Sequence, residues 1–306
     1  MDEVILICSL REARRKALAA ARMEALCLLR DLNPTAPDRG PLAERSGVFW
    51  IALSPDALDQ ATARLPRLGY THAVDLPEDI AHIAVRRNSR AERVRWRRRE
   101  YQLTRLYEED ADATREAAPD RRVFALENAH GDVRAVTGYR GDSGSLSRRG
   151  LPVCDARLLA NLVTGADDMT LLDPFAGVGG IVLEAVASRY RVLSCDLDPA
   201  LRHGLSALGA RHTVADARSL PFGAETIDAI ATEPPYDQHA ESAVIESLAE
   251  MHRVLKPGGR LALLCAAWQA EGLRQKASAL RLMNFLDSPI HRKGTECVAL
   301  AWEKGK

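Results

Sequence analysis

The order of apolar and polar residues divides the chain into two unlike parts. A short apolar run at residues 4–8 predicts a buried strand, and alanine, leucine, arginine and glutamate follow with helical spacing over residues 11–32. A second apolar run covers residues 47–53, and the Ser-Pro-Asp sequence at residues 54–56 is typical of a helix start. This β-α-β-α pattern predicts a small α+β domain.

The C-terminal part alternates strand-like runs with helical segments of roughly 10–15 residues. Strands are predicted at residues 170–172, 191–195, 212–214, 227–232 and 260–265, and helices at residues 179–188, 199–208 and 242–255. The Lys-Pro-Gly-Gly sequence at residues 256–259 predicts a turn, and successive strands near 284–288 and 296–302 predict an antiparallel hairpin. The fold class is therefore α/β, with a mostly parallel, doubly wound sheet.

Two domains of ordinary size fit the length of 306 residues. We expect a small N-terminal α+β domain over residues 1–110 and a larger α/β domain over residues 151–306. Residues 111–150 would connect them, with a β-hairpin predicted at residues 122–139.

Charge is balanced over the whole chain but not along it. Lys plus Arg and Asp plus Glu each number 42, so the net charge does not by itself indicate a nucleic-acid partner. Residues 86–105 nevertheless hold nine arginines against two acids, with Trp96 and Tyr101 between them. Such a segment suits a phosphate backbone, although a solvated helix face is an equally good interpretation. The candidate RNA-binding residues are Arg95, Arg97, Arg98 and Arg99. The His-Arg-Lys sequence at residues 291–293, before the last predicted strand, is expected to be a solvated turn, with contact to RNA phosphates as the alternative.

The cysteines and the termini point to a cytoplasmic protein without a metal. The six cysteines form no Cys-x-x-Cys pair, and no Cys/His cluster has the spacing of zinc ligands. The chain begins with an acidic Met-Asp-Glu-Val sequence, and no apolar run approaches the roughly 18 residues that a membrane span needs.

The first string that indicates chemistry is Asp-Pro-Phe-Ala-Gly-Val-Gly-Gly, which runs from Asp173 to Gly180 between a predicted strand and a helix. Glycines at such a position let the backbone turn sharply and approach a ligand closely. A lone Gly-x-Gly is often only a tight turn, but the longer string is more specific. It lacks the Gly-Lys-Ser/Thr sequence of a triphosphate loop.

Two acidic residues follow the next strands of the predicted sheet. Asp196 ends the second strand, 19 residues after Gly177, where a carboxylate can accept both ribose hydroxyls of a nucleoside. A cap on the following helix is the alternative role, for which Asp198 competes. Asp216, followed by Ala217, comes after the third strand and is placed to accept a hydrogen bond from an adenine amino group, or to be an ordinary loop residue.

The most informative string is Glu233-Pro234-Pro235-Tyr236, directly after the fourth strand. Two prolines make it rigid, and the tyrosine offers a ring face on which a planar base can stack. The carboxylate and the first proline carbonyl can accept the two hydrogens of an exocyclic amine, which directs the nitrogen lone pair toward a methyl donor. A structural Pro-Pro turn is the alternative for the tetrapeptide alone.

Taken together, these motifs resemble those of class I, Rossmann-like amino-methyltransferases, and in particular the THUMP-associated tRNA guanosine N2-methyltransferases. Ile181 and Glu184-Ala185 extend the match of the glycine-rich string, and residues 151–160, which include Asp155, resemble the family's helix that leads into the first strand. The resemblance covers roughly residues 122–302. It implies a seven-stranded sheet, S-adenosylmethionine as the cofactor, and RNA, tRNA in particular, as the partner. The N-terminal domain would then be a ferredoxin-like or reduced THUMP-like unit that docks RNA.

The resemblance also implies roles for single residues. The cofactor loop would be formed by Asp173, Phe175, Ala176, Gly177 and Gly179. Asp196 would hold the ribose, Asp216 and Ala217 the adenine, and Glu233, Pro234, Pro235 and Tyr236 the target base. The chain departs from the family at Glu233, where an aspartate is usual. The extra methylene moves the carboxylate by about 1.5 Å.

The leading interpretation is thus an S-adenosylmethionine-dependent RNA methyltransferase that makes N2-methylguanosine in tRNA. A DNA adenine-N6 or cytosine-N4 methyltransferase shares the Pro-Pro-Tyr motif, but no target-recognition insertion is evident. An RNA-binding protein with a relict cofactor site is the non-enzymatic alternative.

Overall fold

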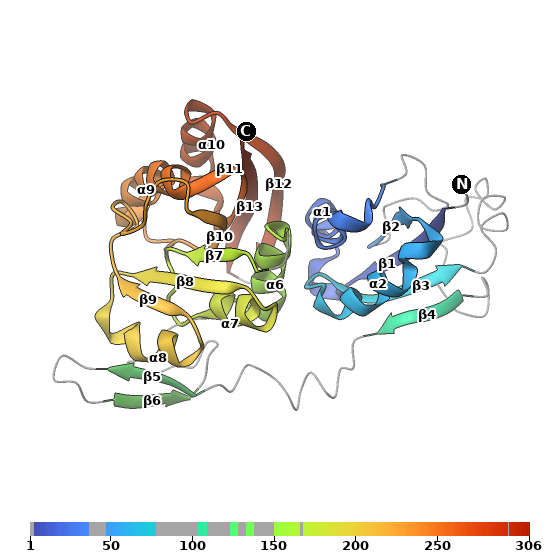
Figure 1. Ribbon diagram of the computed structural model, residues 1–306, viewed down its shortest axis with the longest axis horizontal. Coiled ribbons are helices and arrows are strands. Elements are labelled where there is room, and N and C mark those ends of the chain that lie inside the picture. The colour runs from blue at the N-terminus through green and yellow to red at the C-terminus, as the bar shows by residue number, and fades with distance from the viewer. Residues whose placement is uncertain are drawn as a thin grey trace.

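The structure is a computed structural model that describes residues 3–36, 47–77, 103–108, 123–127, 133–137, 150–165, 168–292 and 294–306 (Figure 1). Within these ranges the chain forms a four-stranded sheet, a seven-stranded sheet and a two-stranded sheet. The two-stranded sheet pairs β5 (Val123–Glu127) with β6 (Val133–Thr137), at the position of the predicted hairpin, and β5 lies beside α8 (Arg202–Ala207).

The N-terminal sheet is antiparallel, in the order β2-β1-β3-β4. Its strands and helices are β1 (Val4–Leu10), α1 (Leu18–Leu28), β2 (Val48–Leu53), α2 (Leu58–Arg64), β3 (Thr71–Pro77) and β4 (Leu103–Glu108). Every residue of β2 is buried, so this strand contributes to the core on both faces.

The helix predicted over residues 11–32 is correct only in its middle. Residues 12–14 and 30–32 form separate 3-10 turns on either side of α1, and Asn33 ends the segment in the left-handed conformation, with φ 51°. The helix predicted after Ser54 begins with a 3-10 turn over residues 55–57, and the Ser54 side chain makes no capping bond.

The C-terminal sheet has seven strands in the order β12-β13-β11-β10-β7-β8-β9 (Figure 1). These strands are β7 (Thr170–Asp173), β8 (Arg191–Asp196), β9 (Arg211–Val214), β10 (Ile227–Thr232), β11 (Leu255–Ala266), β12 (Leu282–Arg292) and β13 (Thr295–Lys304). β13 runs antiparallel between β11 and β12, and the other pairs are parallel. The predicted Rossmann-like α/β sheet with a terminal hairpin is confirmed.

The turn predicted at residues 256–259 lies inside β11 and not before it. β10 advances two residues, from Ile227 to Ala229, while β11 advances five, from Leu255 to Arg260, and Gly258 has a positive φ of 74°. The pairing on both sides of this irregularity keeps the segment within the sheet.

Helices cover both faces of the C-terminal sheet. One face carries α6 (Val153–Leu162), α7 (Gly180–Ala187) and α8, and the other carries α9 (Glu241–Val254) and α10 (Ala270–Ala279) (Figure 1). Successive residues of β7 point to opposite faces of the sheet. Leu171 packs in the apolar cluster that contains α6, and Leu172 packs in the cluster that contains α9.

The sheet has a switch point between β7 and β10. The chain moves outward from β7 through β8 to β9 and then returns to the other side of β7 as β10. Loops that leave the carboxyl ends of two such neighbouring strands diverge to opposite faces, and the crevice between them is the usual ligand site of a doubly wound sheet. The two strings singled out in the sequence are these two loops.

The N-terminal sheet is joined to the C-terminal sheet through α6, which packs against α1. Buried apolar residues of both parts form one continuous cluster. At Gly69 the contact is very close, because an added Cβ would lie 2.3 Å from the carbonyl oxygen of Cys154. A residue without a side chain is therefore required where this loop meets α6.

Candidate active site

The glycine-rich loop leaves β7 at Asp173 and enters α7 at Gly180. Gly177 and Gly179 both have positive φ, 51° and 79°, which favours glycine. No heavy atom lies within 4 Å of a Cβ built on Gly177, so this residue faces open space. At Gly179 an added Cβ would lie 2.5 Å from Leu208, which lets the loop pack tightly on the neighbouring helix.

Asp173 ties the glycine-rich loop to the strand beside it. Its side chain is buried and accepts hydrogen bonds from the Thr232 hydroxyl (2.7 Å) and the Phe175 amide (3.2 Å). Burial raises the pKa of Asp173 to about 7, against the opposing effect of these two donors. Thr232 immediately precedes Glu233, so this bond fixes the two functional loops relative to each other.

Asp196 lies at the end of β8 and braces the loop from the side. One carboxylate oxygen accepts from the Gly177 amide (2.8 Å) and the other from the Asp198 amide (3.0 Å). Asp198 is the residue that caps the next turn, because its side chain accepts from the Ala200 amide. The capping alternative considered for Asp196 therefore belongs to Asp198.

Asp196, Asp216 and Ala217 all line one cavity of about 330 Å³, together with Phe175, Gly177 and other residues. Its wall includes Leu197, an apolar side chain that is 65% exposed. Asp216 is engaged by Arg218, whose guanidinium and amide donate to its carboxylate and lower its pKa. Asp216 thus lines the cavity, and its carboxylate already accepts hydrogen bonds from Arg218.

The Glu-Pro-Pro-Tyr string follows β10 and lines a second cavity of about 300 Å³. Pro234 is buried, and the Pro235 carbonyl accepts a hydrogen bond of 2.8 Å from Gln269, a fully buried side chain that also accepts from the Ala266 amide. The Tyr236 hydroxyl donates to Glu233 (2.6 Å). The string is therefore held at both ends. Phe175, Gly177, Glu233 and Pro235 line both cavities.

Arg292 is a part of this site that the sequence reasoning missed. We expected the His-Arg-Lys sequence at residues 291–293 to be a solvated turn, and for Arg292 this is wrong. Its side chain is 19% exposed and pairs with Glu233 at 2.5 Å, and it also donates to the Tyr236 hydroxyl at 3.0 Å. Burial raises the pKa of Glu233, and Arg292 opposes that shift.

A signal for Arg292 exists in the alternation of β12. Leu286, Ser288 and Ile290 are buried on one face of the strand, and Arg292 is the next residue with the same parity. An arginine at the end of a buried face needs an anionic partner. The sequence alone does not say which acid, because Glu233 is 59 residues away.

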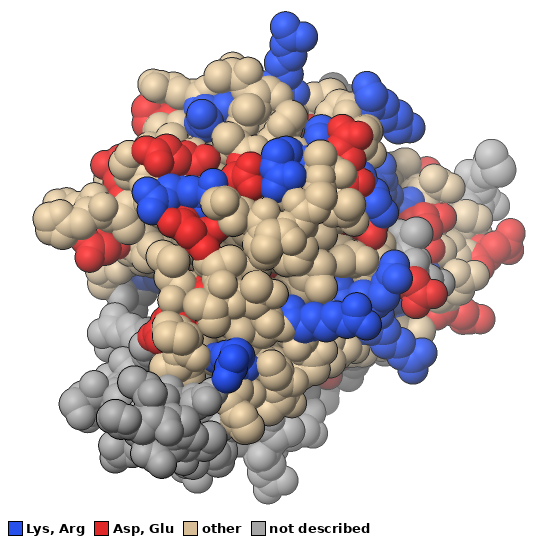
Figure 2. Space-filling model, turned by 60° about the vertical axis from the view of Figure 1, so that its left-hand side comes forward, with Lys and Arg blue, Asp and Glu red and all other residues tan. Residues whose placement is uncertain are grey.

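The predicted RNA-binding arginines Arg95, Arg97, Arg98 and Arg99 lie outside the described residues. On the face seen in Figure 2, the described acidic and basic side chains are intermixed. Among the residues with a described placement, no group of three His, Cys, Asp or Glu side chains is arranged to hold a metal ion. None of the described helices has both the length and the apolar character needed to cross a membrane.

Comparison with known proteins agrees with this geometry. Residues 172–263, from β7 to β11, match a family model described as a methyltransferase domain. The chain contains a methyltransferase domain. Its limits in the match include the glycine-rich loop and the Glu-Pro-Pro-Tyr string, so both candidate loops belong to that domain.

Three curated relatives carry the same printed name, tRNA (guanine(10)-N2)-dimethyltransferase. The protein of Methanothermobacter thermautotrophicus is 33% identical over 122 residues, which are 35% of this chain and 36% of that protein. The protein of Methanocaldococcus jannaschii is 29% identical over 34% of each chain, and that of Pyrococcus abyssi is 30% identical over 43% of this chain and 45% of that protein. The resemblance expected from the motifs is confirmed over these segments.

The chain spans less than half of the length of these relatives. Among solved structures, TrmN from Thermus thermophilus aligns over 99% of this chain and 100% of its own, with 18% identity and a TM-score of 0.48. A geranyl diphosphate methyltransferase in complex with sinefungin aligns over 49% of this chain, with 15% identity and a TM-score of 0.42.

Proposed function

We propose that this protein is an S-adenosylmethionine-dependent methyltransferase that modifies the exocyclic N2 amine of a guanosine in tRNA. The observation that carries the proposal is the meeting of the two loops at the switch point. The Thr232–Asp173 bond joins them, and the two cavities share Phe175, Gly177, Glu233 and Pro235.

The residues of the first cavity fit S-adenosylmethionine. Gly177 opens onto space that a Cβ would fill, which suits the close approach of a ligand to the backbone. Asp196 has a lone pair left on each oxygen for the ribose hydroxyls, and the exposed Leu197 and the buried Ala217 offer apolar surface to the adenine ring. The bound cofactor would supply an electrophilic methyl group.

The second cavity suits a planar base that carries an amine. Glu233 and the Pro234 carbonyl would accept the two N–H hydrogens, and the Tyr236 ring would stack on the base after it leaves its helix. The nitrogen lone pair then points toward the neighbouring cavity. The amine nitrogen would bond to the methyl carbon as the bond between that carbon and the cofactor sulfur breaks, and the methylated amine would then lose one proton to water. Positioning of the amine is therefore the main task of these residues.

The choice of tRNA guanosine is supported by the names of the three relatives and by the motifs that resemble their family. A glutamate in place of the usual aspartate lengthens the acceptor arm. In this chain the Glu233 carboxylate accepts hydrogen bonds from Arg292 and from the Tyr236 hydroxyl, so the longer side chain has partners within the site. We further propose that residues 1–110 with the arginines at 95 and 97–99 dock RNA, and that residues 151–306 carry the transfer.

The direct test measures transfer of a tritiated methyl group from S-adenosylmethionine to total tRNA and to duplex DNA, using the full chain. We expect a label that ribonuclease releases, identified by mass spectrometry of nucleosides as N2-methylguanosine. The same nucleoside should be missing from tRNA of a deletion strain.

The site is tested by the double substitution Glu233→Ala with Tyr236→Ala, which should abolish the label and keep cofactor binding in calorimetry. Glu271→Ala, in an exposed glutamate that lines neither cavity, is the control. Label that survives the double substitution contradicts the proposed site. Label only on DNA contradicts the substrate, and no cofactor binding would favour a relict site.

A further inference from the structure

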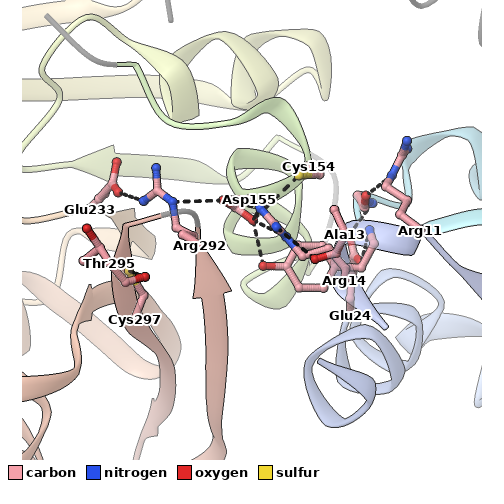
Figure 3. A network of polar contacts seen from close by, with 12 residues as sticks. Arg11, Ala13, Arg14, Glu24, Cys154, Asp155, Glu233, Arg292, Thr295 and Cys297 are labelled. Carbon is pink, nitrogen blue, oxygen red and sulfur yellow. Dashed lines mark hydrogen bonds and ion pairs between the residues drawn. The ribbon is translucent and has the colours of Figure 1, made fainter. Parts of the chain in front are cut away.

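A buried chain of polar side chains runs from the N-terminal part of the protein to Glu233 (Figure 3). Its centre is Asp155 in the first turn of α6, which is fully buried. From the N-terminal side Arg14 donates to both oxygens of Asp155, with distances of 2.8 to 3.0 Å, and the Tyr70 hydroxyl donates at 2.7 Å.

From the other side, Asp155 contacts the arginine of the candidate active site. The Arg292 Nε lies 3.6 Å from an oxygen of Asp155, and its Nη1 donates to Glu233 (Figure 3). The same Nη1 also donates to the Tyr236 hydroxyl. Arg292 therefore contacts two acids. One is Asp155, which Arg14 of the N-terminal part also binds, and the other is Glu233, which would hold the substrate amine.

The chain of four charges is balanced. Arg14 and Arg292 supply two guanidinium groups, and Asp155 and Glu233 supply two carboxylates. Arg14 is 9% exposed and Asp155 is fully buried, so these charges are weakly screened and each needs its partner. The guanidinium of Arg14 donates to both oxygens of Asp155 and neutralises its charge, so the charge of Arg292 is left to pair with Glu233.

We propose that Arg292 is a positioning residue for Glu233 and Tyr236, and that Arg14 of the N-terminal part keeps it in place by saturating Asp155. This inference rests on the proposed function, in which Glu233 accepts a hydrogen of the target amine. It makes the N-terminal part a component of the acceptor site, beyond any role in docking RNA.

The consequence of removing Arg14 follows from the charge balance. One guanidinium then serves two carboxylates, and the fully buried Asp155 competes for it more strongly than Glu233, which is 21% exposed and faces a cavity. Arg292 turns toward Asp155, and Glu233 loses the contact that aims it. If Asp155 loses its charge as well, the guanidinium of Arg292 again has a single carboxylate to pair with, that of Glu233.

The experiment compares the full-length parent with Arg14→Met, Asp155→Asn and the double variant R14M/D155N, using total tRNA from the deletion strain as the methyl acceptor. For R14M we expect kcat to fall about tenfold or more, with an unchanged Kd for S-adenosylmethionine. For R14M/D155N we expect kcat to return to within about twofold of the parent.

Asn161→Ala is the matched control for loosened packing. Asn161 lies in the same helix, is equally buried, and crosses the same interface to Glu24 and to the Arg67 carbonyl, each at 2.8 Å, but it does not contact Arg292 or Glu233. N161A should lower the melting temperature and leave kcat near that of the parent. A double variant no better than R14M, or an N161A loss as large as that of R14M, would overturn the inference.

Crystal structures of the parent and of R14M, without RNA, test this inference independently of the proposed function, because they show the position of Arg292 without any methyl transfer. If the parent transfers no methyl group to tRNA, the proposed function fails, while the position of Arg292 still tests the charge argument. Arg292 on Asp155 in R14M supports it, and Arg292 unchanged on Glu233 contradicts it. If R14M does not fold, Arg14→Gln takes its place and is judged by the same rescue with D155N.

Discussion

The two cavities of the site are built in different ways. The first is shaped largely by backbone: glycines with positive φ, and Asp196 accepting from the amides of Gly177 and Asp198. The second is shaped by long side chains that meet from distant segments, with Arg292 contacting Glu233 across 59 residues and Arg14 contacting Asp155 across 141. A backbone site is set by a local string, whereas a side-chain site depends on the whole fold.

The sharpest test of this difference is Arg292→Met. It removes the only guanidinium that the described residues place on Glu233. Because the acceptor amine would then be held by a carboxylate without its partner, we expect kcat on tRNA to fall about 100-fold, with the cofactor Kd unchanged in calorimetry. Arg274→Met, in an exposed pair with Asp287, is the control. If R292M also weakened cofactor binding, the second cavity would not be independent of the first, and the comparison would fail.

The converse substitution is Gly177→Ala. Its Cβ would enter the open space beside Gly177, which lines the first cavity and borders the second, and φ of 51° adds strain of about 1–2 kcal/mol. We expect the cofactor Kd, measured by calorimetry, to weaken at least about tenfold, which corresponds to 1.4 kcal/mol. Gly258→Ala carries the same kind of strain, with φ of 74°, at a position remote from both cavities. An equal loss of affinity in both variants would point to strain alone.

A smaller effect is expected from pH, through Asp173. Its pKa of about 7 lies above the ordinary value of 3.8, mainly because of burial, so the stability from its protonated form is present below 3.8 and lost as pH rises through 7. The ionised form suits a cationic cofactor. The cofactor Kd should therefore tighten by up to about tenfold between about pH 5.5 and pH 7.5.

The comparison variant for this pH effect is Asp173→Asn, which keeps an acceptor for Thr232 and cannot ionise. Calorimetry in buffers of different ionisation enthalpy would also detect the proton released on binding. A slope that persists in D173N contradicts the assignment of the pH effect to Asp173.

The smallest effect should come from Asp216→Asn. The carboxylate already accepts hydrogen bonds from Arg218, and water screens an exposed pair of this kind, so the pair contributes little. We expect the cofactor Kd to change by no more than about threefold. A loss above about tenfold would show that Asp216 binds the adenine despite Arg218.

The features that could be predicted from the sequence are those built from local backbone, and the features that were missed are those built from side chains of distant segments. The glycine-rich loop and Asp196 could be proposed as site residues from the sequence, because a glycine-rich turn and a strand-end acid leave local patterns. The seven-stranded sheet was predicted because strand and helix periods alternate regularly. Arg292 was mistaken for a solvated residue, and Asp155 was read only as part of a helix, because neither carries a local sign of the acid or arginine it meets.

The N-terminal part illustrates the same limit in the fold. Helical spacing over residues 11–32 suggested one helix, but Arg14 stands in a separate 3-10 turn before α1. That turn places the guanidinium on Asp155. The helical spacing of the sequence gives no sign of this break, because the partner of Arg14 lies 141 residues away.

The close contact at Gly69 and the shared apolar cluster have a thermodynamic consequence. The backbone of the N-terminal part rests directly on α6, and the same cluster contains residues of α1, α6 and α7. Neither part can open its side of that cluster without exposing the other to water, so their unfolding equilibria are linked into a single cooperative transition. A chain cut between the two parts would therefore lose stability and the geometry of its acceptor cavity together.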